Sequence, residues 1–347
     1  MSIATRKMKA IGFTESLPVS EPQSLYVFDA EYPKGTSHDV IVKINAVSMN
    51  PADAKIRIRA AKNTTLDIPK IAGYDAVGTI VAIGDEVKKF ALGDRVYYAG
   101  DVTRQGSNAE YQAVDSRIIA LAPKSLTDAE AAALPLTALT GWEALFDRLR
   151  INHTTKGKSL LIIGGAGGVG SITTQIAKQL TNLTVITTAS RPETIEWSRK
   201  MGADYVANHH DLVSSVKALG FETVDYIFNT ADTVGHWDSM AELIAPQGMI
   251  SSIVEFDGGV DLSKLQGKSA GFVWELMFTR SLFNTPDIEK QGEILQQVAN
   301  LVDAGRIRTT LNETLSGFSA ETLKIAHEKI EKGTAIGKMS IIFNPQD

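Results

Sequence analysis

The stretch LLIIGGAGGVG, residues 160–170, sets four apolar side chains directly before five glycines. A short apolar run that ends in glycines predicts a buried strand followed by a turn. The next segment, residues 171–180, has the apolar spacing of a helix. Gly165, Gly167 and Gly170 fit the pattern G-x-G-x-x-G at this strand-to-helix junction, the context in which the pattern is informative. We therefore predict that the turn cradles the pyrophosphate of a dinucleotide.

Each glycine of the turn has its own role in this prediction. The first allows a tight turn, the second lets the pyrophosphate approach the backbone, and the third lets the helix pack against the strand. The free N–H groups at the start of the helix then face the phosphates. The predicted cofactor-binding turn comprises Gly165, Ala166, Gly167, Gly168, Val169 and Gly170. A glycine-rich turn that binds nothing and an S-adenosylmethionine site are the alternatives that this motif leaves open.

The residues after the next predicted strand indicate which dinucleotide is bound. In NAD-binding units an acidic residue roughly 20 positions further on holds the ribose 2′-hydroxyl. Here the strand VITTAS ends at Ser190 and is followed by Arg191. A hydroxyl and a guanidinium suit a 2′-phosphate, since arginine offers a fixed charge and fork-shaped donors. We therefore predict NADP(H), against the alternative that Arg191 is a solvated residue before a helix. His209 ends the third strand and is a candidate for the same phosphate, although a surface histidine explains it equally well.

Two patterns divide the chain. From residue 1 to 127, short strands are separated by turns rich in Gly and Pro, which is typical of a partly closed β-barrel. From residue 128, strands and helices alternate, which predicts a doubly wound parallel sheet covered on both faces. The tail from 286 reads as helical and ends in the strand KMSIIFN, which we expect to return to the first domain. The predicted fold class is α/β, with a barrel domain of residues 1–127 and 286–347 and a Rossmann domain of residues 128–285.

Two further strand ends are candidates for contact with the cofactor. Open parallel sheets bind ligands at the carboxyl ends of their strands. The predicted strand VDYIFNT ends at Asn229 and Thr230, and the strand GMISSIV ends at Ser252, Ile253 and Val254. We predict that these five residues line the cofactor, with the backbone of the second set meeting the nicotinamide carboxamide.

The composition excludes several classes of protein. The 347-residue chain carries 35 basic and 40 acidic residues, a net charge of −5, so a general nucleic-acid binder is not expected. The absence of cysteine excludes disulfides, thiolate-bound zinc and a cysteine nucleophile. There is no signal-peptide core and no run of roughly 18 apolar residues that would span a membrane. We expect a cytoplasmic protein without nucleic-acid or membrane partners.

Five motifs, taken in order along the chain, resemble one family. They are VSMNPADAKIR (47–57), AGYDAVGTIVAIGDEVKKFALGDRV (72–96), LPLTALTGWEAL (134–145), AGGVGSITTQIAK (166–178) and GKMSII (337–342). Together they resemble the medium-chain dehydrogenase/reductase superfamily, in its zinc-independent quinone oxidoreductase branch, and within it bacterial proteins called zinc-type alcohol dehydrogenase-like. The resemblance runs from end to end. It implies a GroES-like barrel domain, a Rossmann domain that binds nicotinamide, and a homodimer formed through the cofactor domains, with a tetramer as the alternative.

The resemblance also indicates whether this chain has the ligands of a catalytic zinc. Zinc-binding members hold their catalytic metal with a cysteine, with a histidine and a carboxylate, and with a second cysteine. By this resemblance the first ligand falls near Asn50 and the histidine falls at Tyr74, so that only Asp75 is retained. One carboxylate does not make a three-ligand catalytic site. We therefore expect no metal site.

The catalytic candidates come from the same resemblance. Asn50 is expected to contact nicotinamide or substrate, or to cap the helix that starts at Pro51. Tyr74 is a candidate donor to the substrate oxygen, with a barrel-core tyrosine as its alternative. Thr140 is expected near the nicotinamide ribose and amide. No residue stands out as a dedicated general acid.

Two pairs of residues are interpreted from their positions. Asp53 and Arg57 lie four residues apart on one predicted helical face and are expected to pair with each other. Trp142 and Phe278 are candidates for shaping a pocket that accepts aromatic substrates, and a core role explains each of them equally well.

These observations predict an NADPH-dependent oxidoreductase that reduces quinones or α,β-unsaturated carbonyls by direct hydride transfer without metal. Such substrates are already polarised, so positioning, desolvation and hydrogen bonds to the developing oxyanion suffice. The alternatives within the superfamily are an enoyl-thioester reductase and a zinc-type alcohol dehydrogenase. The alternative from another class is a non-catalytic nucleotide-binding protein.

Overall fold

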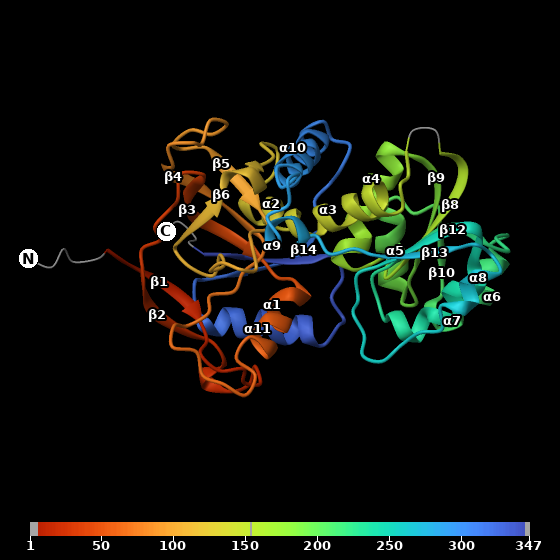
Figure 1. Cartoon of the computed structure of the whole chain (residues 1–347), viewed down its shortest axis with the longest axis horizontal. Helices are drawn as coiled ribbons and strands as arrows, with labels where there is room; N and C mark the ends of the chain where they lie inside the picture. The colour runs from red at the N-terminus through yellow and green to blue at the C-terminus, as the bar shows by residue number, and fades with distance from the viewer. Residues whose placement is uncertain (1–5, 153–154, 344–347) are drawn as a thin grey trace, which may run out of the picture. The chain divides into compact units, whose positions relative to one another are not determined.

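The computed structural model describes residues 6–152 and 155–343, which form two compact units, and Figure 1 labels their elements where there is room. Unit 1 consists of the described residues of Met1–Leu136 and Phe278–Asp347, and unit 2 of those of Thr137–Met277. None of the helices in these described ranges is long and apolar enough to cross a membrane.

The limits of the units differ slightly from the predicted domain limits. Residues 128–136 and 278–285, which the prediction assigns to the Rossmann domain, pack with unit 1. The reason is visible at Thr127 and Asp128, where helix α2 (Asp128–Ala132) begins. Asp128 accepts hydrogen bonds from Arg95 and Asn45, which are both strand residues of unit 1.

Unit 2 is built on a single sheet of six parallel strands. The strands are β8 (Lys156–Ile163), β9 (Asn182–Thr188), β10 (Tyr205–Ala207), β11 (Val224–Asn229), β12 (Ile244–Ser252) and β13 (Gly271–Trp274). Their spatial order is β10-β9-β8-β11-β12-β13, and every neighbouring pair is parallel. Numbered within the unit this is 3-2-1-4-5-6, the doubly wound Rossmann order. The predicted fold class of this part of the chain is confirmed.

Helices cover the sheet of unit 2. They are α4 (Gly168–Leu180), α5 (Pro192–Lys200), α6 (Leu212–Ala218), α7 (Thr233–Leu243) and α8 (Ser263–Gln266), while α3 (Pro135–Trp142) begins in unit 1 and continues into unit 2. Helix α4 packs on β8 and β9, and α7 packs on β11 and β12. Consecutive residues Leu160 and Leu161 of β8 are both fully buried, so both faces of the central strand are covered. A π-helical turn over Glu143–Arg148 continues α3 without a break.

Unit 1 contains a larger, mainly antiparallel sheet. Its strands are β3 (Asp39–Ser48), β4 (Ala76–Ile83), β5 (Arg95–Tyr98), β6 (Tyr111–Asp115), β7 (Ala120–Leu121), β14 (Leu311–Ser316) and β15 (Lys338–Ile342). The order is β14-β15-β3-β4-β5-β7, and β6 pairs with β3 beside β15. A separate hairpin joins β1 (Lys7–Gly12) to β2 (Tyr26–Glu31). Unit 1 also holds helices α1 (Pro51–Arg59), α9 (Thr279–Leu282), α10 (Lys290–Asp303) and α11 (Ala320–Glu331).

The last strand returns to the first part of the chain, as predicted. Strand β15 pairs with β3 in antiparallel register, with Ile341 opposite Val47. The helical reading of the tail is wrong for Leu311–Ser316, which forms β14. This strand carries polar residues such as Asn312 and Glu313 and is only half-buried, so it has little of the apolar signal on which strand prediction depends. It exists because β15 offers it a parallel partner.

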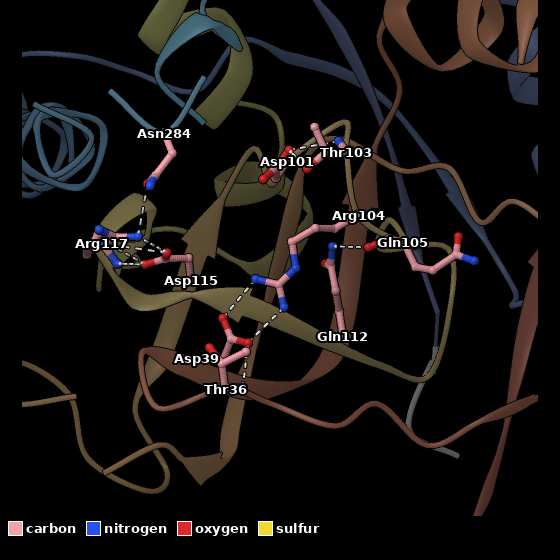
Figure 2. A network of polar contacts seen from close by, with 10 residues as sticks. All are labelled: Thr36, Asp39, Asp101, Thr103, Arg104, Gln105, Gln112, Asp115, Arg117 and Asn284. Carbon is pink, nitrogen blue, oxygen red and sulfur yellow. Dashed lines mark hydrogen bonds and ion pairs between the residues drawn. The ribbon is translucent and has the colours of Figure 1, made fainter. Parts of the chain in front are cut away.

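The loop between β5 and β6 is held to the sheet of unit 1 by a polar network (Figure 2). Arg104 donates to both carboxylate oxygens of Asp39, at 2.8 and 2.9 Å. Burial alone would raise the pKa of Asp39, but the bonds from Arg104 and from the Thr36 N–H lower it. Gln112 of β6 donates to the carbonyl oxygen of Gln105 at 3.0 Å. The loop is therefore fixed to strands β3 and β6, and the N–H of its Gly106 donates to the Ile71 carbonyl oxygen at 2.8 Å.

Candidate functional site

The glycine turn of unit 2 is tied to the neighbouring strand by its own backbone. Gly164 has a φ of +89°, a conformation that favours glycine. Its N–H donates to Thr188 Oγ1 at 2.9 Å, and the N–H of Gly165 donates to the Thr188 carbonyl oxygen at 3.2 Å. The turn after β8 is thus fixed against the end of β9, and helix α4 starts directly after it, with Gly167 as its N-cap.

The space around each glycine of the turn shows whether packing requires it. A Cβ added at Gly165 would lie 2.5 Å from Thr187 Cβ, and one added at Gly170 would lie 2.3 Å from the Gly164 carbonyl oxygen. These two glycines are therefore required by packing within the unit. A Cβ at Gly167 would meet only the Gly164 carbonyl oxygen, at 3.5 Å. The backbone at Gly167 is consequently open, and the first N–H groups of α4 lack acceptors within the helix.

An open backbone at a helix N-terminus fits a phosphate group. The residues of the predicted turn, from Gly165 to Gly170, therefore fit the pyrophosphate of a dinucleotide. Gly165 and Gly170 set the close approach of strand and helix, whereas Gly167 leaves the space for the ligand. Ala166 is buried, and Gly168 and Val169 form the first turn of α4.

The end of β9 carries the residues predicted to select the cofactor. Ser190 and Arg191 follow the strand, and Arg191 is the N-cap of α5. The Arg191 side chain is 45% exposed and forms a surface ion pair with Glu193, Nε to Oε1 3.1 Å. Such an exposed pair contributes little stability, so the guanidinium can exchange it for a phosphate. No carboxylate occupies the position that an NAD-binding unit uses for the ribose 2′-hydroxyl.

His209 lies beyond the neighbouring strand end. The Ala189 N–H donates to the carbonyl oxygen of Ala207 at 3.0 Å, which aligns the end of β9 with the end of β10. His209 follows two residues after Ala207, with its ring 4.2 Å from that of His210. Partial burial lowers the pKa of His209, and repulsion by His210 and His236 lowers it further. A neutral imidazole can donate to a phosphate but brings no charge of its own.

The strand ends of β11 and β12 meet in a hydrogen-bonded cluster. Asn229 is fully buried, and its Nδ2 donates to Thr233 Oγ1 and to Ser252 Oγ, each at 3.1 Å. The Ile253 N–H donates to the Asn229 carbonyl oxygen at 3.2 Å. Thr233 Oγ1 also donates to the Val254 carbonyl oxygen at 2.6 Å. The side chains of this cluster therefore bond one another and hold the two strand ends together.

Thr230 joins this edge to the glycine turn. Its N–H and its Oγ1 both donate to the carbonyl oxygen of Ile163, at 3.0 and 2.8 Å. The strand ends of β8, β11 and β12 are thus brought together at one edge, as a parallel sheet requires. Thr140 lies in α3, one residue before Gly141, where α3 approaches Thr173 of α4 closely enough that a Cβ would overlap it. Thr140 is itself buried within unit 2.

A buried polar cluster in unit 1 contains Asn50 and Lys338. The Lys338 ammonium donates to the Met49 carbonyl oxygen at 2.6 Å, to Asn50 Oδ1 at 2.6 Å and to Asp75 Oδ2 at 3.0 Å. Asn50 Nδ2 in turn donates to Asp75 Oδ2 at 2.7 Å and to the Tyr74 carbonyl oxygen at 3.0 Å. Asn50 is 1% exposed. Its side-chain amide is therefore committed to neighbours in the same unit.

The predicted pairing of Asp53 with Arg57 is wrong. The Asp53 carboxylate accepts from the N–H of Asn50 at 2.8 Å and from the N–H of Gly73 at 3.0 Å. Burial raises the pKa of Asp53 to about 7, although these bonds and the nearby Lys338 lower it. Free N–H groups at a helix start attract a carboxylate more directly than a side chain one turn along the helix.

Arg57 is fully buried, and its guanidinium contacts His327 and Glu331 of α11. It donates to the Leu17 carbonyl oxygen, pairs with Glu331 and contacts His327 Nδ1 at 3.5 Å. Burial, together with repulsion by Arg57, lowers the pKa of His327 to about 3. This network fastens α1 to α11 and has no contact with the polar cluster at Asn50 in the hydrogen bonds of the described residues.

Tyr74 presents a hydroxyl without a partner. The side chain is fully buried, and its ring packs edge-on against Phe278 with centroids 5.5 Å apart. Among the described residues, no group forms a hydrogen bond with its hydroxyl. Burial raises the pKa of Tyr74, with Asp53 and Asp101 adding to the effect, so the hydroxyl keeps its proton. Buried hydroxyls are normally bonded, so the unbonded hydroxyl of Tyr74 calls for an explanation.

The loop between β5 and β6 also forms backbone hydrogen bonds with the segment that precedes Tyr74. The N–H of Ser107 donates to the Gly73 carbonyl oxygen at 3.1 Å, and the N–H of Asn108 donates to the Ala72 carbonyl oxygen at 3.0 Å. A Cβ at Gly73 would lie 2.5 Å from Ser107 Oγ, and the φ of Gly73 is +114°. The side chains of Ser107 and Asn108 are buried and, within the described part of the chain, have no hydrogen-bond partner.

The two aromatic pocket candidates have different surroundings. Phe278 is 6% exposed and packs on Tyr74. Trp142 of unit 2 packs on Phe146, with ring centroids 5.1 Å apart. Each therefore has an aromatic neighbour within its own unit.

The donors around Asp75 do not fit a catalytic zinc. Such a site needs three ligands drawn from histidine, cysteine and carboxylate side chains. No group of three or more such side chains is arranged to hold a metal among residues 6–152 and 155–343. The neighbours of Asp75 are instead an amide, from Asn50, and an ammonium, from Lys338.

The sequence prediction missed Lys338 and gave Asp53 the wrong partner. Lys338 stands at the start of a strand whose other residues, Met339 to Ile342, are mainly apolar and buried. A lysine as the first residue of an apolar strand could have indicated a buried ion pair, because buried lysines are rare unless they are paired. Asp53 is the third residue after Asn50, and a carboxylate at this position commonly accepts a hydrogen bond from the N–H of the residue that caps the helix. This spacing could have predicted its bond with the N–H of Asn50.

Comparison with known proteins places this geometry in a family. Residues 36–124 match the alcohol dehydrogenase GroES-like domain, and residues 201–341 match the zinc-binding dehydrogenase family. A zinc-type alcohol dehydrogenase-like protein of Staphylococcus aureus is 45% identical over 338 residues, which cover 96% of this chain and 99% of the relative. A 2-methylene-furan-3-one reductase of Solanum lycopersicum is 30% identical over 346 residues, which cover 96% of this chain and 79% of the relative.

A solved structure supports the same assignment. The crystal structure of a Rhizobium etli protein named as a zinc-dependent alcohol dehydrogenase is 45% identical, with a TM-score of 0.94, and the match covers 99% of this chain and 100% of the other. The chain belongs to the medium-chain dehydrogenase/reductase superfamily of oxidoreductases.

Proposed function

We propose that this oxidoreductase is an NADPH-dependent reductase of quinones or α,β-unsaturated carbonyls. The observation that carries the proposal is the open backbone at Gly167, at the start of α4, combined with Arg191 instead of a carboxylate after β9. When bound, NADPH supplies a hydride to the electrophilic carbon of the substrate. The chain itself binds the cofactor, positions the substrate and stabilises the negative charge that forms on the substrate oxygen.

Cofactor binding is assigned to unit 2. The N–H groups at the start of α4 face the pyrophosphate, and Ser190 with Arg191 holds the 2′-phosphate. His209 is proposed as a further neutral donor to the same phosphate. Asn229, Thr230, Ser252, Ile253 and Val254 hold the strand ends at the edge of the sheet where ligands bind. Thr140 is proposed to lie near the nicotinamide.

Stabilisation of the oxyanion is assigned to the Tyr74 hydroxyl. It is a protonated donor at physiological pH because burial raises its pKa, and no described residue uses it. A donor of this kind serves a carbonyl oxygen that gains charge as hydride is delivered to a quinone or enone. The relative named 2-methylene-furan-3-one reductase acts, by its name, on such an enone, which supports this substrate class.

Alcohol oxidation with a catalytic zinc is the rival suggested by the names of other relatives. Our proposal departs from these names because Lys338 and Asn50 surround the one carboxylate, Asp75, that would hold a metal. An enoyl-thioester reductase would use the same Tyr74 donor and differs in the size of the substrate. Assembly as a homodimer belongs to this proposal and is measured by light scattering.

The experiment is a steady-state assay with NADPH and a panel of quinones, enones, enoyl thioesters and simple ketones. We expect oxidation of NADPH with quinones or enones, unchanged after exhaustive chelation. Tyr74→Phe should lower kcat by about 100-fold, the effect of losing one oxyanion donor, and leave the Kd for NADPH unaltered. Tyr111→Phe, a half-buried tyrosine of β6, is the matched control and should keep full activity. Tight NADPH binding without oxidation by any member of the panel would contradict the proposal.

A further inference from the structure

The buried ammonium of Lys338 occupies an internal cation site. Three oxygen atoms from two separate segments surround Nζ at 2.6, 2.6 and 3.0 Å: the carbonyl oxygen of Met49, Oδ1 of Asn50 and Oδ2 of Asp75. The side chains of Lys338 and Asp75 are 4% and 0% exposed. Each of the three N–H bonds of the ammonium therefore has an acceptor, which is the condition under which a buried lysine is tolerated.

The contacts of this ammonium lead directly to Tyr74. Asn50, whose Oδ1 accepts from Lys338, donates through Nδ2 to the Tyr74 carbonyl oxygen at 3.0 Å. Asp75, the next residue after Tyr74, accepts from Lys338 and also from the Leu136 N–H at 2.7 Å. On the other side of Tyr74, the N–H of Gly73 is held by Asp53 at 3.0 Å.

We propose that Lys338 is a positioning residue that acts as a resident cation and fixes the Gly73–Asp75 segment, so that the Tyr74 hydroxyl is held for the substrate oxygen. This inference rests on the function proposed above. Lys338 does not itself touch the substrate in this scheme. It acts through Asn50 and Asp75, whose polar atoms are used within the cluster.

The charge balance of the cluster explains why a cation is needed. The titratable groups that face one another are Asp53, Asp75 and Lys338, all of them buried. Burial raises the pKa of Asp75, and the neighbouring Lys338 and the bond from Asn50 oppose that rise. Without Lys338 no positive group of the cluster would offset two buried carboxyls, and breaking a buried pair leaves an uncompensated charge.

The arrangement leaves no room for a metal ion at Asp75, because a tethered ammonium already fills the space between the oxygen atoms of Met49, Asn50 and Asp75. Because the cation is part of the chain, its occupancy does not depend on metal supply. The relation between strand β15 and the helix start at Asn50 is set by the pairing of β15 with β3.

The test compares variants that alter the cation. Lys338→Met removes the charge at similar length, and Lys338→Arg retains it. Lys329→Met, an exposed lysine of α11, is the matched control for loss of one positive charge. We expect Lys338→Met to lower kcat by about 10- to 100-fold, the scale of a misplaced catalytic group, with the KM for the enone and the Kd for NADPH changed less than about threefold. Lys338→Arg should recover part of kcat, and Lys329→Met should match the wild type.

A second variant keeps the test decisive if Lys338→Met does not fold. Lys338→Ala removes the side chain beyond Cβ, and a small alkylammonium such as propylammonium replaces it in shape and charge. We expect propylammonium to raise kcat of Lys338→Ala at least fivefold, whereas propanol of the same size should not. A folded Lys338→Met with wild-type kcat, or equal effects of propylammonium and propanol, would overturn the proposal.

A readout without turnover separates this inference from the proposed function. In wild-type protein, ¹⁵N-lysine spectra should show one slowly exchanging ammonium signal that is absent from Lys338→Arg. Amide hydrogen exchange at Gly73 and Asp75 should be at least tenfold faster in Lys338→Met, while the amides of α4 are unchanged. If the wild type reduces no quinone or enone but shows both effects, the proposed function fails and the positioning of the segment stands. If both effects are absent, Lys338 does not hold this segment.

Discussion

Replacing Gly167 by alanine tests the cofactor site at the one glycine that packing does not require. The added Cβ would meet only the Gly164 carbonyl oxygen at 3.5 Å, an ordinary contact, and the φ of Gly167 is −73°. Alanine adopts this conformation without strain. Such a replacement stabilises a protein by about 0.4–1 kcal/mol, because the unfolded chain loses freedom. The free energy of unfolding of Gly167→Ala should therefore be unchanged or slightly increased.

The same replacement should weaken the binding of NADPH strongly, although it does not lower the stability of the protein. A methyl group at Gly167 fills the space through which the pyrophosphate reaches the N–H groups of α4. Loss of two charge-assisted hydrogen bonds, at about 1.5–3 kcal/mol each, corresponds to about 3–6 kcal/mol. This is a rise in Kd of roughly 10²- to 10⁴-fold.

Gly170→Ala is the matched comparison. Its Cβ would lie 2.3 Å from the Gly164 carbonyl oxygen and 2.8 Å from Gly165 Cα, so the main chain must shift. We expect a loss of at least about 1–3 kcal/mol of stability, as for an overpacked core. A thermal melt followed by circular dichroism gives the stability, and fluorescence titration gives the Kd of NADPH. If Gly167→Ala binds NADPH as tightly as the wild type, the pyrophosphate does not lie at this turn and the reasoning fails.

Two further predictions concern charge. Arg191→Ala should raise the Kd of NADPH by about 10- to 100-fold, the value of one charge-assisted bond to phosphate, and change that of NADH less than about twofold; equal weakening would refute the 2′-phosphate assignment. For Asp53, whose pKa is raised from 3.8 to about 7 on folding, the unfolded chain ionises first, so its contribution to stability declines as pH rises from about 4 to about 7. The Tm of the wild type relative to Asp53→Asn should fall between pH 5 and pH 8, and a constant difference would show that Asp53 does not titrate in this range.

The alternation of strands and helices after residue 128 was readable because it depends on local composition. Apolar runs such as Leu160–Ile163 form buried strands wherever helices cover both faces, and glycines after the run form the turn. The same reasoning failed at Leu311–Ser316, where a half-exposed strand gains its stability from a partner, β15, rather than from its own composition. The identity of a strand at an edge is thus a property of the sheet more than of the segment.

In the candidate site too, features within one local segment were predicted correctly, whereas features that depend on distant partners were not. The glycine turn between β8 and α4 forms where the sequence predicts it, because all of its members lie within one strand-turn-helix segment, and its contact with a cofactor stays a prediction. The pairing of Asp53 with Arg57 was wrong, although both lie on α1, because each found a stronger partner: backbone N–H groups for Asp53, and Glu331 and Leu17 for Arg57. Spacing along a helix shows which side chains are neighbours and does not show what else lies against them.

The sequence alone determined the class of fold, the glycine turn after the first strand of unit 2 and the lack of thiol ligands, since these follow from residue types and from contacts a few positions apart. Only the tertiary structure decided that a lysine 263 positions further along the chain supplies the cation beside Asp75. Burial makes that choice, because a charge removed from water must be compensated by whichever partner the fold brings within about 3 Å. Strand β15 delivers Lys338 to that place by pairing with β3, a long-range contact with no signature in local sequence.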